Sequence, residues 1–379
     1  MASDNMSNKL VIVCQSAGFL LVDVANEALG RYKCVVLVAS GCSFMERPLD
    51  SRIRVDKIIR YDKSTAFRRI FTWLAATLQI FHKLLWHYRG YEVMYFTNPP
   101  MSYFCSRLLQ NRYRVVVWDL YPDALRAVGV GSKNMIWRLW AGMNRKVFAK
   151  AERVVTLGGS MKQAVSKYCA AENVTVAPPW SGSSKFFRIE KLDNQFIVRH
   201  GLAGKFIVLY SGNIGYTHSV EVLVEVARLL REDKDLLFLI IGQGKKRSEI
   251  EQSVFEYGLS NVILMDYQPV DMLPYSLGAA DLGVVTLDEN VAAVSVPSKT
   301  FNLFASGVPI LAIADERTEM HHLLTLYGNG RCISKGRTEE MAAFIRQLKG
   351  DPALHRGMSD ASLRAARDFT FANASLYFK

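Results

Sequence analysis

The sequence predicts an α/β protein built from two doubly wound, Rossmann-like domains. Val-rich apolar runs of four to six residues recur through both halves, and amphipathic stretches separate them. A segment rich in Pro, Gly and Ser, residues 177–190, divides the two series. Buried strands without polar alternation, separated by helices, are typical of parallel sheets covered on both faces. At 379 residues the chain is long enough for two such domains.

The strands follow one another in the same plan in both halves. In the first half we expect strands at Leu10–Cys14, Cys34–Ala39, Val93–Thr97, Val115–Asp119 and Arg153–Thr156. Helical patterns lie at 20–30, 64–88, 100–110, 133–150 and 160–170. The second half predicts strands at Phe206–Tyr210, Leu236–Ile241, Val262–Met265, Leu282–Thr286 and Ile310–Ile313. We therefore predict domains at 1–185 and 186–365, and a helix at 366–379 that crosses back to the first domain.

Composition excludes several classes of protein. Hydrophobic residues make up 50% of the chain and charged residues 22%, which indicates a globular protein. The six cysteines are scattered, which favours a reducing compartment over a disulfide framework. HExxH, a P-loop and GxGxxG after the first strand are all absent from the sequence, which disfavours NTPases and dehydrogenases. No metal or other cofactor is expected.

Charge is distributed unevenly between the halves. Residues 1–200 hold 29 Lys and Arg against 14 Asp and Glu, whereas residues 201–379 hold 18 against 21. The basic half indicates contact with a membrane, a lipid diphosphate or a nucleic acid, or simply a solvated basic face. Nucleic acid is the least favoured, because no recognised module accompanies the charge.

The stretch 64–88 carries a broad apolar face. Spacing of about 100° per residue gathers Phe67, Ile70, Phe71, Leu74, Leu78, Phe81, Leu84, Leu85 and Tyr88 on that face. The uncharged run 70–81 is too short to span a bilayer. The pattern predicts either a helix at a membrane surface, favoured by Trp73 and Trp86, or a helix whose wide face covers a sheet.

Two turns of the second half are candidates for binding a diphosphate. The segment LYSGNIGYTH follows a strand, and Gly212 and Gly215 would let the backbone approach phosphates, while Asn213 or His218 could donate hydrogen bonds. An ordinary β–α turn would also favour these residues. Gly242 and Gly244, after the next strand, give weaker support for the same site.

Later in the second half, a lysine stands at the start of a helix. Pro297 and Ser298 precede Lys299, and the helix continues through Asn302. A cation in the first turn opposes the helix dipole, which favours phosphate binding over a solvated lysine. Gln268 follows another strand, where a nucleobase edge could bind.

The first half places polar side chains after its strands as well. Asp119 follows the strand at 115–119 and either binds hydroxyls or caps the next turn; Trp118 and Asp123 lie beside it in sequence. Asn98 ends the preceding strand, and Gly18 follows the first one. Because ligands bind at the carboxyl ends of parallel strands, we expect these residues to line one mouth of a cleft between the domains.

The chain resembles the GT-B glycosyltransferases of family 4, in the bacterial branch that builds surface polysaccharides and includes the N-acetylfucosamine transferase of O-antigen synthesis. The matching segments occur in the expected order and span nearly the whole chain: Thr97–Pro100, Val117–Asp123, Val174–Trp180, Tyr210–His218 and Pro297–Pro309.

The resemblance implies that the second domain binds a nucleotide sugar and the first an acceptor. Gly212, Asn213, Ser298 and Lys299 would contact the diphosphate, and Gln268 would lie near the base. Asn302 stands at the place of the second glutamate of the family's E-x7-E pattern, which holds the ribose, and Val294 stands at the place of the first. Main-chain groups of 293–296 would then contact the donor sugar. The family's N-domain histidine aligns with Trp118 or Asp119.

The expected function is transfer of a hexosyl or N-acetylhexosaminyl group, with retention, from a UDP-sugar to a polyprenyl-diphosphate-linked acceptor. The expected location is the cytoplasm, at the inner face of the plasma membrane. Lys299 is the candidate electrostatic catalyst, and Asp119 is a candidate ligand of the acceptor or of sugar hydroxyls. The alternatives are a nucleotide-sugar 2-epimerase of the same fold and a non-catalytic partner subunit.

Overall fold

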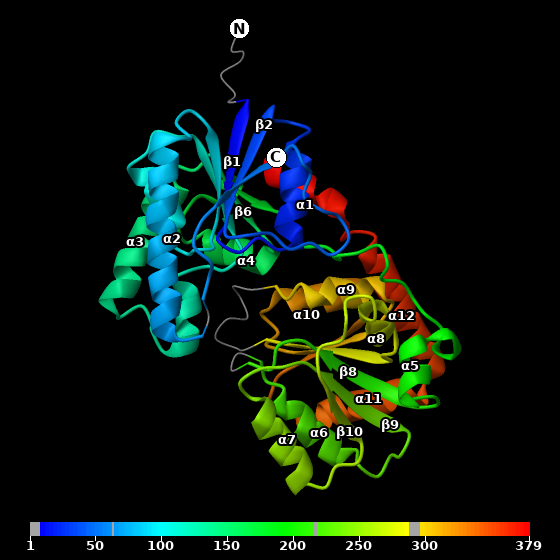
Figure 1. Cartoon of the computed structure of the whole chain (residues 1–379). Helices are drawn as coiled ribbons and strands as arrows, with labels where there is room; N and C mark the ends of the chain where they lie inside the picture. Colours follow the sequence, from blue (N-terminus) through cyan, green and yellow to red (C-terminus); the bar gives the residue numbers. More distant parts are fainter. Residues whose placement is uncertain (1–7, 63, 216–217, 288–295) are drawn as a thin grey trace. The chain divides into compact units, whose positions relative to one another are not determined.

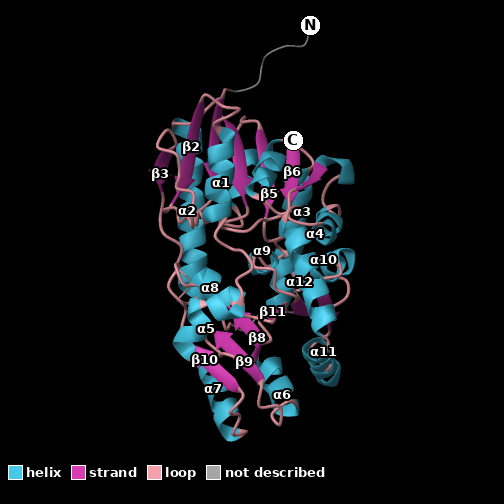
Figure 2. Cartoon of the chain, turned by 90° about the vertical axis from the view of Figure 1, so that its right-hand side faces the viewer, coloured by secondary structure: helices cyan, strands magenta, loops and turns pink. Residues whose placement is uncertain are grey.

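The chain forms two compact units in a computed structural model that describes residues 8–62, 64–215, 218–287 and 296–379 (Figure 1). Unit 1 comprises Met1–Gly182 and Phe371–Lys379, and unit 2 comprises Ser183–Thr370. Each unit has its own parallel sheet, and the strands of each are flanked by helices (Figure 2). The predicted pair of Rossmann-like α/β domains is confirmed.

The sheet of unit 1 has seven parallel strands. In spatial order they are β3 (Arg54–Lys57), β2 (Cys34–Ala39), β1 (Lys9–Val13), β4 (Glu92–Phe96), β5 (Tyr113–Val117), β6 (Arg153–Thr156) and β7 (Val174–Val176). The central strands β1 and β4 are buried almost throughout, as their apolar sequences predict. Strand order reverses between β1 and β4, where Gln15 N donates to Asn98 O at 2.6 Å.

Four α-helices and four 3₁₀-helices accompany this sheet. They are α1 (Phe19–Ala28), α2 (Ala66–Trp86), α3 (Met135–Phe148), α4 (Gly159–Val165), η1 (Ser102–Arg107), η2 (Asp123–Val128), η3 (Ala171–Asn173) and η5 (Phe371–Phe378) among the described residues. Local capping sets two of the starts: Thr65 accepts from Arg68 N at 3.2 Å, and Asn134 accepts from Ile136 N at 2.8 Å. The helix predicted at 100–110 is the short η1.

The segment η5 completes the core of unit 1. Its Tyr377 is fully buried, packs edge-on against Trp180 with ring centroids 6.2 Å apart, and receives a hydrogen bond from the Trp118 indole at 3.4 Å. Trp180 in turn donates to Asp23 at 2.8 Å, and Asp23 pairs with Arg47 through two bonds. Residues far apart in sequence thus close one side of this core.

The sheet of unit 2 has six parallel strands. In spatial order they are β10 (Val262–Met265), β9 (Leu236–Ile241), β8 (Phe206–Ser211), β11 (Leu282–Thr286), β12 (Ile310–Ile313) and β13 (Gly330–Ile333). The accompanying helices are α5 (Gln195–His200), α6 (Glu221–Leu229), α7 (Arg247–Glu256), α8 (Leu273–Gly278), α9 (Lys299–Ala305), α10 (Glu319–Tyr327), α11 (Thr338–Gly350), α12 (Pro352–Ala366) and η4 (Lys191–Asp193). Strand order reverses between β8 and β11, which marks the expected ligand edge of this sheet.

Asp281 stabilises the amino-terminal edge of the unit 2 sheet, which is opposite the expected ligand edge. It immediately precedes β11, and its carboxylate accepts from Ile207 N of β8 at 2.7 Å and pairs with Lys191 of η4. Its side chain is only 11% exposed. One buried carboxylate therefore joins a strand start to the segment that enters unit 2.

We predict that Asp281→Ala lowers the free energy of unfolding by about 1–3 kcal/mol, because the buried N–H of Ile207 loses its acceptor. Urea denaturation followed by circular dichroism measures the effect. The exposed Asp271 provides a control, since Asp271→Ala should change stability by less than about 0.5 kcal/mol. Equal effects of the two substitutions would contradict the role of Asp281.

Candidate functional site

The turn after β8 is a tight glycine turn at the point where strand order reverses. Gly212 has φ of 156°, which favours glycine, and the Tyr210 hydroxyl donates to Asn213 O at 2.6 Å. The Asn213 side chain is exposed, and Gly215 approaches it so closely that a Cβ at 215 would lie 2.6 Å from Asn213 Nδ2. Backbone and side-chain amides are thus gathered beside β8.

The turn after β9 packs its backbone directly against that first turn. A Cβ at Gly242 would lie 1.9 Å from Gly212 O, and one at Gly244 would lie 2.3 Å from Ile214 O. Gly212 N donates to Ile241 O, and Ile214 N donates to Gln243 O, both at 2.9 Å. Gly242 and Gly244 are therefore required to hold the first turn in shape, which explains their glycine character without any ligand.

Lys299 brings a positive charge to the same turn. It is the first residue of α9, and its Nζ lies 4.2 Å from the centroid of the Tyr210 ring. A Cβ at Gly212 would lie 3.0 Å from this nitrogen. Part of the lysine side chain is exposed, but Nζ is buried and has no hydrogen-bond partner among the described residues. Burial lowers the pKa of Lys299 to about 8.

His218 lies within the influence of this charge. Burial, and secondarily the charge of Lys299, lower the pKa of His218 to about 4. The imidazole is therefore neutral at pH 7, and it can donate one hydrogen bond without adding a second positive charge. A buried ammonium and a neutral imidazole together form a site suited to an anion.

The other residues that were predicted to bind the sugar donor follow β10 or lie around the start of α9. Ser298 is exposed and makes no side-chain cap hydrogen bond, and Asn302 lies one turn further along α9. Pro297 precedes them and is half-buried. Gln268 follows β10, and its side-chain amide donates to Asp266 O at 3.0 Å. The main-chain groups of 293–295, Val294 included, lie outside the described residues, as do residues 216–217.

Unit 1 presents an exposed carboxylate after β5. Asp119 is exposed, and its backbone N–H and that of Trp118 both donate to Thr97 Oγ1, at 3.2 and 3.1 Å. The pKa values of Tyr61 and Tyr121 are raised mainly by burial, and the charge of Asp119 raises both further. Asp119 thus stands at the carboxyl edge of the sheet, beside two tyrosines.

Two buried amide oxygens lie at the reversal between β1 and β4. Gln15 Oε1 and Asn98 Oδ1 have no hydrogen-bond partner among the described residues. Gln15 is held in place because its Nε2 donates to Ile59 O at 3.2 Å and to Thr72 O at 3.0 Å. Gly18 is the N-cap of α1 nearby in sequence, with open space where a Cβ would point. The two oxygens are acceptors that hydroxyl groups of a ligand could satisfy.

Asp123 and Trp118, two of the residues predicted for the acceptor side, make contacts inside unit 1. Asp123 is 4% exposed and accepts a hydrogen bond from the Tyr168 hydroxyl. The Trp118 ring packs against Phe96 at 4.7 Å and bonds to Tyr377. These three residues are close in sequence but differ in exposure: Asp119 alone among them is exposed.

A pocket of about 760 Å³ at the edge of the unit 1 sheet was missed by sequence reasoning. Its lining comes from the ends of β1 and β2, the segment after β3, and α2: Ser16, Ser40, Ile59, Arg60, Tyr61, Asp62 and Thr72. Tyr61 stacks on Trp73 with ring centroids 5.8 Å apart. The signal available in the sequence was the apolar-then-basic run at 58–62, which joins a strand to α2.

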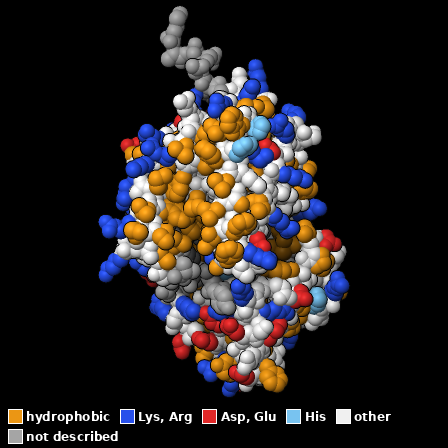
Figure 3. Space-filling model, turned by 60° about the vertical axis from the view of Figure 1, so that its left-hand side comes forward, with side chains coloured by type: hydrophobic (Ala, Val, Ile, Leu, Met, Phe, Trp, Pro, Cys, Tyr) orange, Lys and Arg blue, Asp and Glu red, His pale blue; other side chains and the backbone are white. Residues whose placement is uncertain are grey.

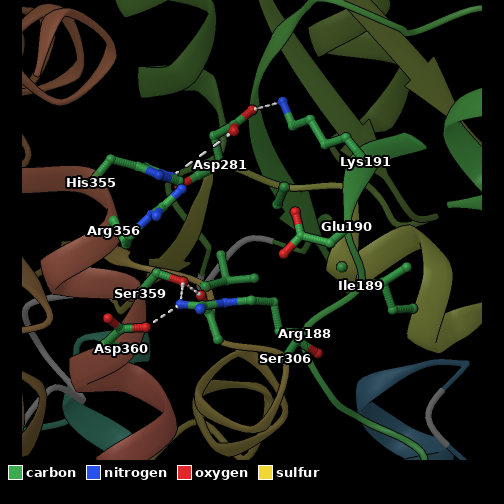
Figure 4. Close-up of a pocket in the computed structure, with 14 residues that line it drawn as sticks. Arg188, Ile189, Glu190, Lys191, Asp281, Ser306, His355, Arg356, Ser359 and Asp360 are labelled. Carbon is green, nitrogen blue, oxygen red and sulfur yellow. Dashed lines mark hydrogen bonds and ion pairs between the residues drawn. The ribbon is translucent and has the colours of Figure 1, made fainter. Parts of the chain in front are cut away.

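A second pocket, of about 410 Å³, lies in unit 2 at the amino ends of β11 and β12 (Figure 4). Its charges neutralise one another: Arg188 bonds to Asp360 at 2.6 Å, and Lys191 pairs with Asp281. His355 approaches Asp281 O at 2.9 Å. This pocket lies at the edge of the sheet opposite Lys299 and offers paired charges, in contrast to the unpartnered ammonium.

The described residues contain no group of three or more His, Cys, Asp or Glu side chains arranged to hold a metal ion. Lys299 and the exposed Lys245 of the turn after β9 are two cations at the carboxyl edge of the unit 2 sheet that can neutralise an anion.

The residues that build this anion site lie in a segment that is similar to a known family. Residues 194–364 match the family described as glycosyl transferases group 1. The matched range contains both glycine turns, His218 and Lys299.

Two curated relatives resemble about two thirds of the chain. WcaI of Escherichia coli K12, named as a colanic acid biosynthesis glycosyl transferase, is 32% identical over 250 residues, which cover 64% of this chain and 61% of the relative. WbjE of Pseudomonas aeruginosa, named as a glycosyltransferase, is 25% identical over 248 residues, which cover 64% of this chain and 62% of that protein. The matches thus span less than two thirds of each relative.

Solved structures share the fold over nearly the whole chain. HepE of Anabaena, crystallised in complex with UDP, aligns with a TM-score of 0.72 at 14% identity and covers 97% of each chain. WaaG, a glycosyltransferase involved in lipopolysaccharide biosynthesis, aligns with a TM-score of 0.71 at 16% identity, also covering 97% of each. The likeness shows a two-domain Rossmann-like fold.

We predict that Lys299→Met raises the free energy of unfolding at pH 7 by up to ~3 kcal/mol. The folded pKa of about 8 lies below the ordinary 10.5, so the fold penalises the charged lysine, and that difference corresponds to ~3 kcal/mol. The penalty is complete below pH 8 and disappears as pH rises towards 10.5, so the gain should vanish there.

Denaturant unfolding at pH 7 and pH 10 measures this effect. The exposed Lys234 supplies the control, since Lys234→Met should change stability little at either pH. A Lys299→Met protein less stable than the wild type at pH 7 would show that the ammonium is well solvated or paired.

Proposed function

We propose that this protein is a glycosyltransferase that moves a sugar from a nucleotide diphosphate, of the uridine type, to a polyprenyl-diphosphate-linked acceptor in surface polysaccharide synthesis. The observation that carries the proposal is the buried Lys299 ammonium, which lacks a partner among the described residues and lies beside the glycine turn after β8. The match of residues 194–364 to the glycosyl transferase family supports it.

A diphosphate meets the electrostatic need of this site. Burying an ammonium without a counter-charge is costly, and an entering anion removes that cost while regaining the Coulomb attraction in a poorly solvated place. The amides gathered around Gly212 and Asn213 and the neutral His218 add donors that do not compete with Lys299 for negative charge. The names of WcaI and WbjE, and the UDP bound to HepE, agree with this ligand class.

The chemistry follows from where charge develops. As the bond between the anomeric carbon and the diphosphate oxygen breaks, negative charge grows on the diphosphate, and Lys299 stabilises it. The acceptor hydroxyl forms the new bond to the same carbon, and its proton passes to the departing diphosphate oxygen. This front-face exchange retains the anomeric configuration and requires no nucleophile from the protein.

Unit 1 would supply the acceptor side. Asp119 would accept hydrogen bonds from sugar hydroxyls, and the unpartnered oxygens of Gln15 and Asn98 would do the same. The pocket beside Tyr61 and Asp62 is large enough for a saccharide unit.

We predict that Lys299→Ala lowers turnover by about 10²–10³, as loss of one preorganised donor to a developing charge does in other enzymes. The assay mixes purified protein, a panel of UDP-sugars and a polyprenyl-diphosphate saccharide, and detects the product by mass spectrometry. Lys234→Ala should retain wild-type turnover.

Near-normal turnover of Lys299→Ala would contradict the proposal. Conversion of a UDP-sugar in the absence of acceptor would indicate an epimerase instead. A wild-type protein that binds UDP-sugar but transfers nothing to any acceptor would indicate a non-catalytic subunit.

We predict that UDP affinity falls by up to about tenfold between pH 7 and pH 9. The free protein loses the Lys299 proton near its pKa of about 8, whereas bound diphosphate favours the charged form, so binding takes up a proton above that pH. Titration calorimetry measures both the affinity and the proton uptake. In Lys299→Arg the guanidinium stays charged, so binding, though weaker, should not vary over this range.

A further inference from the structure

An exposed apolar surface on unit 1 takes no part in the proposed reaction. Of the 21 large hydrophobic side chains that are exposed among the described residues, ten lie on α2, on α3 and at the end of η1. We call this surface the apolar platform: Phe67, Ile70, Phe71, Leu74, Leu78, Trp86, Leu108, Met135, Ile136 and Leu139. Figure 3 shows hydrophobic side chains spread over this face of unit 1, with Lys and Arg side chains along its margin.

The platform is continuous because η1 connects the two helices. Cys105 of η1 lies 3.9 Å from the Thr77 carbonyl of α2. On its other side, the Tyr103 hydroxyl donates to Asn144 of α3 at 2.9 Å and accepts from Trp140 of α3 at 3.1 Å. The three elements therefore form one surface layer.

The broad apolar face of α2 points to solvent. Its buried row is narrow and consists of Thr72, Ala76, Ile80 and Leu84. In contrast, Phe67 is 78% exposed and Leu78 is 69% exposed. The wide apolar face anticipated for this helix thus does not cover the sheet, and α3 repeats the arrangement with Met135 at 73% exposure. Contiguous exposed patches of this kind mark interaction surfaces.

The charges on the three elements of the platform are all positive, although Arg68 and Lys83 pair with Asp62 and Asp56 of the segment before α2. Residues 66–86, 102–107 and 135–148 contain seven Lys and Arg and no Asp or Glu. Arg138, Arg145 and Lys146 of α3 are exposed. Apolar and aromatic side chains bordered by cations are the combination that binds the boundary between lipid headgroups and acyl chains.

We propose that the apolar platform docks unit 1 on an anionic lipid membrane, with α2 and α3 lying in the membrane surface. A second copy of the chain would bring the same excess of cations, among them Arg138, Arg145 and Lys146, to the margin and be repelled. None of the described helices combines the length and the apolarity that are needed to cross a bilayer, so attachment through these elements is lateral. The proposal stands without the proposed sugar transfer, because it concerns binding alone.

The test is co-sedimentation of the full-length chain with vesicles of phosphatidylcholine, with or without phosphatidylglycerol. We expect binding that requires phosphatidylglycerol and weakens at high salt. The triple variant Phe71→Glu, Leu78→Glu, Ile136→Glu should weaken partitioning by at least about tenfold. Arg138→Gln with Arg145→Gln should weaken it by about fivefold per cation removed.

The control is Phe255→Glu, which changes an 86% exposed phenylalanine on α7 of unit 2 and should leave vesicle binding unaltered. Circular dichroism and thermal melting establish that each variant is folded. Failure of the wild-type protein to co-sediment with phosphatidylglycerol vesicles would overturn the proposal. A folded triple variant that binds vesicles like the wild type would also overturn it. The same holds if the only effect of the triple substitution is the loss of a dimer in analytical ultracentrifugation.

Discussion

The desolvated ammonium of Lys299 is the constraint around which the second unit is arranged. A cation held against the Tyr210 ring, with its nitrogen buried, is stable only because the surrounding fold fixes α9 and β8 in place. The glycines at 212, 242 and 244 let three backbone segments pack within hydrogen-bonding distance of one another, which positions β8's turn under the lysine. The buried charge lowers the stability of unit 2, but its electrostatic field is in place before a ligand binds.

The two units carry different polar groups on a similar strand order. Each places its candidate groups at the point where strand order reverses, but unit 2 gathers a cation and amide donors, whereas unit 1 gathers acceptor oxygens from Gln15, Asn98 and Asp119. Donors suit phosphate oxygens, and acceptors suit hydroxyl groups. This division matches the donor and the acceptor of the proposed reaction.

Much of the fold could be predicted because its strands are buried on both faces and are therefore read directly as Val-rich runs. Three edge strands, β3, β7 and β13, were not among the predicted strands. RVDK and GRCI carry charged residues or glycine where burial is partial, and β7 is only three residues long. The location of Lys299 at a helix start was predictable, but its contact with Tyr210 depends on two strands meeting in space. Similarly, Asp119 and Asp123 look alike in sequence, and only the position of Tyr168 separates them. The α3 part of the platform was missed because short apolar clusters on a helix normally indicate a core.

The chain order of the two units has a consequence for biosynthesis. Unit 2 is continuous in sequence, so it can fold as soon as it emerges from the ribosome, whereas unit 1 receives Tyr377 only after all of unit 2 has been translated. Until then, Trp180 and Trp118 lack the ring that covers them. The core of unit 1 is therefore completed only after Tyr377 has been synthesised, and a fragment that ends before η5 would leave Trp118 and Trp180 without that ring.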